Sequence, residues 1–307
     1  MPARVTITFL LAVLVLHGAG TGVSASGPSQ RDRAYWLAIV ENGYAVPEGA
    51  TPFELLLEMN ALLGSPDPDL RDRVAYSAAA RWIYQERRLA ASELKRLLTL
   101  WSDNLRAGAQ TGSDAVLRRS FSALNLSVLA ALDNEAPFMT QAEFDRLLRE
   151  SLAYLLEERD RRGYETGTGW IHATAHAADL LKFLARNPKL PTAAQKAILD
   201  AISETCGGAG GVFAWGEDER LAQIVRSLAR RADFEPDVFE GWLAASARAH
   251  RVLWAEASSI DPERFAAVQN AKLVLRSAYV ALSLDASLPG PGGSAVRALG
   301  AALARMQ

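Results

Sequence analysis

Two histidines and an aspartate are spaced so that a single helix would present all three side chains on one side. His172, His176 and Asp179 are separated by four and three residues, and such intervals bring side chains onto one face of an α-helix. A histidine pair at i and i+4 is the spacing of helix-borne zinc sites. Imidazole groups also transfer protons near neutral pH and bind small ligands. The spacing predicts a polar site with three candidate chemistries: metal binding, acid–base catalysis and ligand binding.

A metal at this site would need a ligand beyond the two histidines. Asp179 is either that ligand or the acceptor that orients the nearer imidazole, and Asp160, Glu217 or Asp218 could contribute from elsewhere. The glutamate that follows the first histidine in metalloprotease helices is absent, so that motif does not occur. A divalent metal held by His172 and His176 is still left open, and the sequence identifies no other cofactor.

The same side chains could instead form a structural network. A dense run of charge, from Glu157 to Arg162, precedes a turn that contains Gly163, Gly167 and Gly169. Buried polar groups in proteins are nearly always hydrogen-bonded. Ion pairs between the charged run and the histidine helix would therefore brace the turn without any ligand.

A second group of charged residues follows the glycine-rich stretch 207–211. Asp218 is one of three consecutive acids that open a predicted helix, where the helix dipole favours negative charge. Asp218 or Arg220 could instead reach the histidine helix. Arg276 lies on an apolar helix, and a buried arginine there would need an acidic partner. The candidate catalytic residues are His172, His176 and Asp179, and the candidate ligand-binding residues are Asp160, Arg162, Trp170, His172, His176, Asp179, Asp218, Arg220 and Arg276.

The elements that position these residues are predicted to be helices. Threonine or aspartate caps precede several apolar periodic segments, at Thr51, Thr140, Thr192 and Asp261. Proline at the first helical position follows two of these caps. No segment alternates apolar and polar residues as a half-buried strand does. The predicted helices are 31–42, 52–63, 69–86, 93–106, 114–132, 141–160, 170–186, 193–205, 217–231, 237–256, 262–284 and 294–305.

The spacing of the helix starts favours a helical repeat. The starts at Thr51, Ser92 and Thr140 lie 41 and 48 residues apart, and two helices in about 40–50 residues is the spacing of HEAT and armadillo repeats. We therefore expect an all-α chain of eleven or twelve helices, arranged as a HEAT/armadillo-like α-solenoid of helical pairs in one domain, 26–307. A compact all-α bundle fits the same pattern.

The amino terminus is typical of a secretory signal peptide. Arg4 precedes an apolar run over 5–16, and Val23-Ser-Ala25 matches a small-x-small cleavage site. The run is shorter than the roughly 20 apolar residues that a membrane span requires. We expect cleavage of 1–25, a periplasmic or secreted location, and no stable membrane insertion afterwards.

Composition narrows the partner classes. The chain of 307 residues has 33 Lys and Arg against 35 Asp and Glu, for a net charge of −2. It therefore lacks the basic excess of a general nucleic-acid binder. Cys206 is the single cysteine, so no disulfide can close within the chain. The remaining partner class is a protein or a small molecule.

Blocks in a fixed order along 60–285 carry a family resemblance: Leu63-Gly-Ser-Pro-Asp-Pro-Asp-Leu-Arg-Asp72 with Ala75-Tyr76, Arg119-Ser-Phe-Ser122 with Asn134 and Pro137-Phe138, Arg159-Asp-Arg-Arg-Gly163, Gly169-Trp-Ile-His-Ala-Thr-Ala-His176 with Ala178-Asp179, Gly216-Glu-Asp-Glu-Arg-Leu221, and Asn270 with Leu275-Arg-Ser-Ala-Tyr279. In these blocks the chain resembles the bacterial domain of unknown function 2785 family. The resemblance implies an all-α, HEAT-like fold and supplies no reaction. The chain departs from that family by its signal peptide and by Ala278 in place of the usual leucine.

The resemblance also groups polar and aromatic positions that either pair inside the fold or line one concave surface: Asp72, Arg119, Asp160, Arg162, Trp170, His172, His176, Asp179, Asp218, Arg220, Asn270 and Arg276. We expect an exported solenoid that binds a protein or small molecule in a polar groove around His172, His176 and Asp179. A hydrolase that uses a His/Asp acid–base pair or a bound divalent metal is the alternative.

Overall fold

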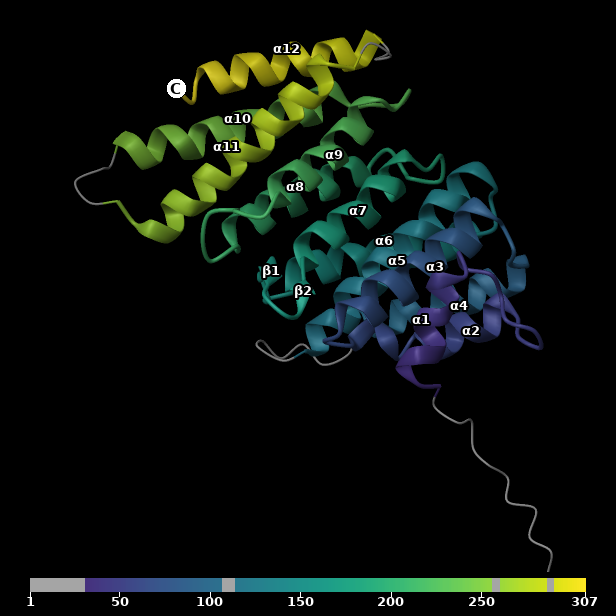
Figure 1. The fold of residues 1–307 in the computed structure, drawn as a ribbon. Helices are drawn as coiled ribbons and strands as arrows, with labels where there is room; N and C mark the ends of the chain where they lie inside the picture. Colours follow the sequence, from purple (N-terminus) through teal and green to yellow (C-terminus); the bar gives the residue numbers. More distant parts are fainter. Residues whose placement is uncertain (1–30, 107–113, 256–259, 286–289) are drawn as a thin grey trace, which may run out of the picture. The chain divides into compact units, whose positions relative to one another are not determined.

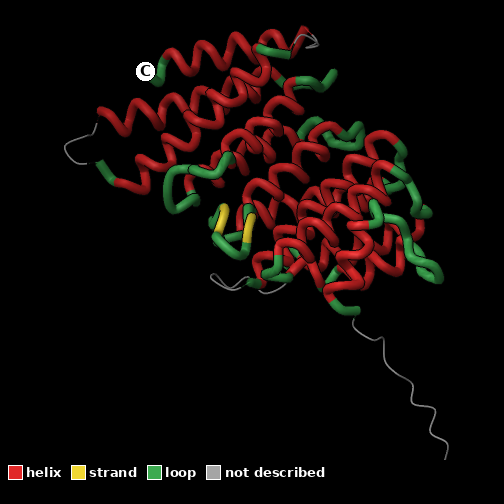
Figure 2. Tube along the Cα trace, in the orientation of Figure 1, coloured by secondary structure: helices red, strands yellow, loops and turns green. Residues whose placement is uncertain are grey.

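Helices make up nearly all of the regular structure in a computed structural model of the chain, which describes residues 31–106, 114–255, 260–285 and 290–307. The predicted signal peptide, 1–25, lies outside the described residues. Twelve α-helices occur in the described ranges, with short 3₁₀- and π-helical segments between them. Figures 1 and 2 show that helices dominate the fold. The helical class predicted from the sequence is confirmed.

The elements follow one another in this order: α1 (Arg33–Glu41), α2 (Pro52–Met59), a 3₁₀ turn η1 (Leu62–Gly64), π-helical η2 (Asp69–Tyr76), α3 (Ser77–Ala79), π-helical η3 (Ala80–Gln85), α4 (Ala91–Asn104), α5 (Ala115–Glu135), α6 (Gln141–Glu157), β1 (Tyr164–Glu165), β2 (Gly169–Trp170), α7 (Ala173–Arg186), α8 (Ala194–Gly207), α9 (Glu217–Ala229), α10 (Pro236–Ala255), α11 (Pro262–Ser283) and α12 (Gly290–Ala304). Residues from Arg33 to Gln307 form one compact unit.

Most of the predicted caps are present. The hydroxyl of Thr51 accepts the backbone N–H of Glu54, and Thr140 does the same for Glu143, each at 3.2 Å. In both cases the glutamate carboxylate accepts the backbone N–H of the threonine, so two backbone donors at the start of the helix are satisfied. The expectation at Thr192 is wrong, because its hydroxyl donates to the distant Asp233 and α8 begins at Ala194 without a side-chain cap.

Alternate helices along the chain pack against one another. Helix α5 contacts α7, α7 contacts α9, and α9 contacts α11. The intervening helices are packed beside them, with α4 on α5, α6 on α7, and α8 and α10 on α11 (Figure 1). Helices two apart in the chain, from α5 to α11, thus contact one another in order.

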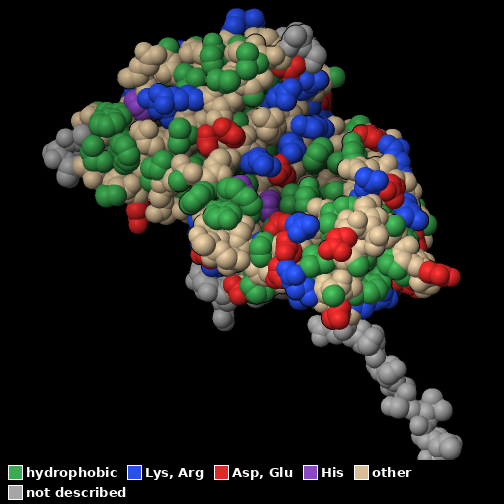
Figure 3. All heavy atoms as spheres, in the orientation of Figure 1, with side chains coloured by type: hydrophobic (Ala, Val, Ile, Leu, Met, Phe, Trp, Pro, Cys, Tyr) green, Lys and Arg blue, Asp and Glu red, His purple; other side chains and the backbone are tan. Residues whose placement is uncertain are grey.

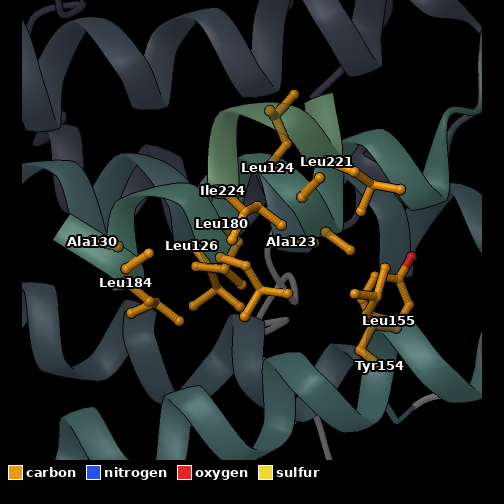
Figure 4. Close-up of a cluster of buried hydrophobic side chains, with 14 of the residues drawn as sticks. Ala123, Leu124, Leu126, Ala130, Tyr154, Leu155, Leu180, Leu184, Leu221 and Ile224 are labelled. Atoms are coloured by element: carbon orange, nitrogen blue, oxygen red, sulfur yellow. The ribbon is translucent and has the colours of Figure 1, made fainter. Parts of the chain in front are cut away.

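The core is centred on α5. Nearly every residue of this 21-residue helix from Val116 to Asp133 is buried. Figure 4 shows Ala123 and Leu126 of α5 among Leu180 of α7, Ile224 of α9 and other apolar side chains. In the described ranges, α5 is the one helix long and apolar enough to cross a membrane. Because its neighbours α4 and α7 cover it, α5 is the central core helix of this fold.

A two-stranded hairpin precedes α7, where the sequence predicted only a glycine-rich turn. Tyr164 pairs with Trp170, and Glu165 pairs with Gly169, in antiparallel register. Gly167 and Gly169 have φ values of +91° and +78°, a backbone region that glycine adopts without strain. Two paired residues per strand are too few to produce an alternating sequence pattern, which is why the hairpin was not predicted.

Candidate functional site

One buried arginine fastens the hairpin to the amino-terminal helices. The guanidinium of Arg71, on η2, is fully buried and donates to the backbone carbonyls of Thr168 and Trp170 at 2.6 and 3.2 Å. It also donates to the carbonyl of Ser65 and to the Asp72 carboxylate. Because arginine offers five donors in a rigid fork, one side chain joins three segments of the chain.

The loop before α9 clamps the other side of the hairpin. The ring Nε2 of His172 donates to the carbonyl oxygen of Trp215 at 2.8 Å, which assigns the proton to that nitrogen. The backbone N–H of Trp215 in turn donates to the carboxylate of Glu217. The indole of Trp215 lies against the backbone of Gly163, so close that any side chain there would collide with it. The indole and the hairpin therefore hold each other in place.

His172 does not lie on the helix that follows it. Its φ of 52° is left-handed, and α7 begins at the next residue, Ala173. The predicted helix over 170–186 is thus wrong in its first three residues. The His172 ring stacks on Trp170, with centroids 4.7 Å apart, and meets the His176 ring edge-on at 5.8 Å. The two imidazoles are neighbours, as predicted, although a single helix face does not present them.

His176 is held by one nitrogen. Its Nδ1 lies 2.8 Å from the hydroxyl of Ser120, and that hydroxyl donates to the carbonyl of Ile171. The serine oxygen therefore accepts from Nδ1–H, and Nε2 carries the lone pair. Within the described part of the chain, no hydrogen bond occupies this Nε2. The edge of the ring packs against Phe121.

Burial keeps both imidazoles neutral. Desolvation lowers the pKa of His176 well below its ordinary value, and the neighbouring His172 and Arg220 add to the effect. Desolvation also lowers the pKa of His172, although its bond to Trp215 opposes the shift. A neutral His176 with a free lone pair can accept a proton or a hydrogen bond.

Asp179 is ion-paired on both oxygens. Lys182 lies 2.7 Å from one carboxylate oxygen and Arg220 of α9 lies 2.5 Å from the other. Asp179 itself is buried, whereas the Arg220 side chain is half exposed. Nearby, burial raises the pKa of the Tyr76 hydroxyl, and the charge of Asp179 adds to that shift. The carboxylate thus anchors Arg220 at the surface beside the histidines.

Three exposed aromatic side chains cover this cluster. Tyr164, Trp170 and Trp215 are 46, 42 and 46% exposed. Trp170 contacts Tyr164 and Trp215 edge-on, with centroids 5.2 and 6.2 Å apart. A hollow of about 190 Å³ adjoins Trp215. We call Trp170, His172, His176, Asp179, Trp215 and Arg220 the hairpin site. Figure 3 shows histidine side chains near the middle of one face, among acidic, basic and hydrophobic groups.

Two predicted site residues belong elsewhere. Asp218 accepts a hydrogen bond from Ser277 of α11 at 2.7 Å, so it joins α9 to α11. Arg276 is exposed and lies with Lys272 and Tyr279 beside another surface hollow. The expectation of a buried Arg276 paired with an acid is wrong, because this residue falls on the outer side of α11.

Asp160 and Arg162 lie just before β1 and support the hairpin from there. The Asp160 carboxylate forms a 2.6 Å ion pair with Arg162, whose guanidinium also reaches Glu165 of β1. The Arg162 carbonyl accepts the backbone N–H of His172. These ion pairs brace the hairpin within the charged run and β1, whereas the structural network considered from the sequence joined this run to the histidine helix.

The described residues around His172 and His176 do not provide a complete set of metal ligands. The described residues contain no group of three or more His, Cys, Asp or Glu side chains placed to hold a metal. His172 already donates from Nε2, and both oxygens of Asp179 are ion-paired. The other proposed ligands, Glu217 and Asp160, bind the Trp215 backbone and Arg162.

Several residues of the site were not singled out from the sequence. Arg71, Tyr76 and Ser120 contact or influence it from segments about 50 to 100 residues away. All three stand inside the blocks that carry the family resemblance, which is the one sequence signal that could have indicated them. Trp215 stands beside the acidic helix start and gives no separate signal.

A family model described as "Protein of unknown function (DUF2785)" matches residues 104–280. The match covers more than half of the chain, and the chain belongs to this family. The six residues of the hairpin site lie inside the matched region, whereas Arg71 and Tyr76 precede it. No curated protein and no solved structure matches the chain.

Proposed function

We propose that this chain is an exported α-solenoid whose hairpin site binds a small molecule or a protein segment. Export rests on the signal-peptide pattern of residues 1–25, which would leave a single domain over 26–307. The solenoid is supported by the ordered contacts α5–α7–α9–α11 and by the repeat spacing of the helix starts.

The observation that carries the proposal is an aromatic surface that is both exposed and fixed. The side chains of Trp170 and Trp215 are more than two-fifths exposed. Trp170 nevertheless stacks on His172, and the backbone N–H and carbonyl of Trp215 are both hydrogen-bonded. Exposed aromatic groups are enriched where proteins bind partners. Pre-ordered side chains reduce the entropy lost on binding. Exposure of these aromatic rings and their fixed positions both favour the binding of a ligand or partner.

The neighbouring polar groups define the ligand's chemistry. Arg220 presents a half-exposed guanidinium whose position is set by Asp179, and such a group binds carboxylates and phosphates. His176 offers a neutral acceptor. We infer a ligand with a flat apolar part, which stacks on Trp170 or Trp215, and an anionic or hydroxyl group, which faces Arg220. A nucleic acid is not expected, because the chain is slightly acidic.

Retention of compounds from cell-envelope extracts tests this proposal. Immobilised wild-type protein would be exposed to small-molecule and protein fractions, and retained species would be identified by mass spectrometry. Trp215→Ala and Arg220→Ala should lose a species that the wild type retains. Trp254→Ala is the matched control, because Trp254 is 47% exposed on α10 and contacts His250 and Phe265 instead of the hairpin site. Equal retention by Trp215→Ala and Trp254→Ala contradicts the proposal.

A catalytic function is favoured by one feature, the state of His176. A neutral imidazole oriented through Nδ1, with a free Nε2, is the arrangement of a general base. The hydrolase alternative therefore rests on this residue together with Asp179. His176→Asn should abolish hydrolysis of ester, amide or glycoside test substrates, while thermal unfolding reports folding. Wild-type protein that hydrolyses none of these substrates removes this alternative.

A further inference from the structure

The hollow of about 190 Å³ beside Trp215 is lined by three segments that are distant in the sequence. Arg161 comes from the connection between α6 and β1, and Thr174 from the first turn of α7. The rest of the lining is the stretch 209–215, between α8 and α9, together with Glu217. The hairpin site shares Trp215 with this hollow, whereas the other lining residues have had no role so far.

The guanidinium of Arg161 lines the hollow with most of its donors unused. Its Nη1 donates to the hydroxyl of Thr174 at 2.8 Å. In the described part of the chain the buried Nε makes no hydrogen bond, and the accessible Nη2 makes none either. No carboxylate among the described residues forms an ion pair with this side chain. Because a guanidinium has five N–H donors, the accessible Nη2 is left for a partner from outside the fold.

The acids whose charge reaches Arg161 are bound by other groups. Glu158 forms a buried ion pair with Arg119 at 2.6 Å, and Glu217 accepts a backbone N–H of the loop at 2.8 Å. Burial lowers the pKa of the Arg161 guanidinium below its ordinary value, and the charge of the exposed Arg159 adds to this effect, whereas the charges of Glu158 and Glu217 oppose it. A cation that is removed from water needs a close counter-charge. An anion in the hollow would supply it.

The other wall of the hollow is apolar. Val212 and Trp215 are 47 and 46% exposed, and Phe213 between them is partly buried. All three line the hollow together with Arg161. Exposed large apolar side chains that adjoin an unpaired charge suit a ligand with an apolar part and one charged group.

The loop that carries this apolar wall is held in place by a buried asparagine. The amide oxygen of Asn270, on α11, accepts the backbone N–H of Phe213 at 2.8 Å. Its amide nitrogen donates to the carbonyls of Cys206 and Gly211 at 3.2 and 2.9 Å. Asn270 has no exposed surface. Because the loop is ordered before binding, a ligand that packs against it loses less entropy.

We propose that this hollow binds a small apolar monocarboxylate of about the size of benzoate. The carboxylate accepts hydrogen bonds from the guanidinium of Arg161, the charge-assisted pairing for which arginine is suited. The apolar part covers Val212 and Phe213. Glu217 lines the same hollow, and its charge disfavours a doubly charged anion such as phosphate more than it disfavours a monoanion. The hollow is smaller than pockets for drug-sized molecules, which limits the ligand to a single ring or a short branched chain.

Isothermal titration of the purified full chain with benzoate tests the proposal. We expect saturable binding, and no binding of benzamide, which has nearly the same shape without the charge. Arg161→Met should weaken the affinity for benzoate by about tenfold or more, the value of a hydrogen bond to a charged group. Arg251→Met makes the same change of charge at an exposed position of α10, outside the hollow, and should bind as the wild type does.

A second variant tests the apolar wall without disturbing the fold. Val212 is exposed, so Val212→Ser should fold normally, weaken the binding of benzoate, and leave the weaker binding of acetate unchanged. Val280→Ser is the matched control, because Val280 is 54% exposed on α11 and does not line the hollow. Inorganic phosphate should bind more weakly than benzoate.

Four results would each overturn the proposal: absence of benzoate binding, equal binding of benzamide, phosphate binding as tight as that of benzoate, or unchanged benzoate binding by Arg161→Met. Thermal unfolding in the presence and absence of benzoate accompanies each titration. The wild type should be stabilised by benzoate, whereas Arg161→Met should not. A purely structural role of Arg161 predicts the same response to benzoate in both proteins. The hairpin site is tested independently, because Trp215 and Arg220 are unchanged in all these variants.

Discussion

The indole ring of Trp215 occupies the position that a side chain at Gly163 would take. A Cβ atom built on Gly163 would lie 2.1 Å from Cγ of Trp215, far inside van der Waals contact. The glycine is thus required by a residue 52 positions later in the chain, and it fixes an exposed aromatic ring against the hairpin. This pair joins the α6–α7 connection to the α8–α9 connection.

Gly163→Ala should displace the Trp215 indole. Overpacking of this kind costs about 1–3 kcal/mol of unfolding free energy, and we expect a lower melting temperature together with a changed tryptophan emission. Gly207→Ala is the control, because nothing lies within 4 Å of a Cβ atom at that position. The interpretation is wrong if Gly163→Ala melts like Gly207→Ala with unaltered emission.

Arg71→Met should loosen the hairpin. The methionine fills much of the space but leaves the carbonyls of Thr168 and Trp170 without their donor, so we expect a loss of about 3–5 kcal/mol. Amide hydrogen exchange over 163–172 should accelerate more than exchange elsewhere. Arg73→Met, which removes an exposed pair with Asp69, should change stability by less than about 1 kcal/mol. Similar exchange rates in both variants would contradict the role of Arg71.

Stability should fall as the pH drops below about 6.5, the ordinary histidine pKa. Desolvation lowers the pKa of His176 in the native state, so the unfolded chain binds more protons there and unfolding becomes easier in acid. One histidine contributes a slope of up to about 1.4 kcal/mol per pH unit. His176→Asn, which keeps a donor for Ser120, should reduce this slope between pH 7.5 and 5.5 in urea titrations. His250→Asn should retain most of it, and an identical slope in His176→Asn refutes the assignment.

Asp133 joins two connections between helices, and its loss should be costly. Its carboxylate is buried and accepts from the backbone N–H groups of Phe138 and Met139, from Asn187 and from Lys189. Burial alone would raise its pKa, but these hydrogen bonds outweigh that effect and lower it. Asp133→Ala should therefore destabilise the fold by about 3 kcal/mol or more, against little change for Asp145→Ala. Chemical denaturation measures both, and near-equal midpoints would refute this role.

Local signals in the sequence predicted most helices, because a cap and an apolar period are properties of a few neighbouring residues. Proline at the first helical position identified α2 and α11 at their first residues, and the glutamate at the third position added to the signal for α2. The cap predicted at Thr192 is wrong, because its hydroxyl binds Asp233, a residue 41 positions later in the chain. Tertiary contacts of this kind leave no periodic pattern.

The candidate site was predicted in part. The spacing of the histidines indicated His172, His176 and Asp179 as site residues, and the second group of charged residues indicated Arg220. His172 has a left-handed backbone and lies between the hairpin and α7, where it contacts Trp215 of a distant loop, and the spacing of histidines could not indicate either feature. Arg276 was misplaced because one charged residue on an apolar helix occurs as readily on its outer side as on its inner side.

Cys206 gives the protein a chemical reporter of its own unfolding. The thiol is buried at the end of α8, and desolvation, aided by the charge of Asp218, raises its pKa to about 12. Thiolate is the reactive form, so alkylating reagents meet an inert group in the native state and a reactive one once the chain opens. The rate of labelling at this single position therefore follows the opening of the α8 region, without any engineered probe.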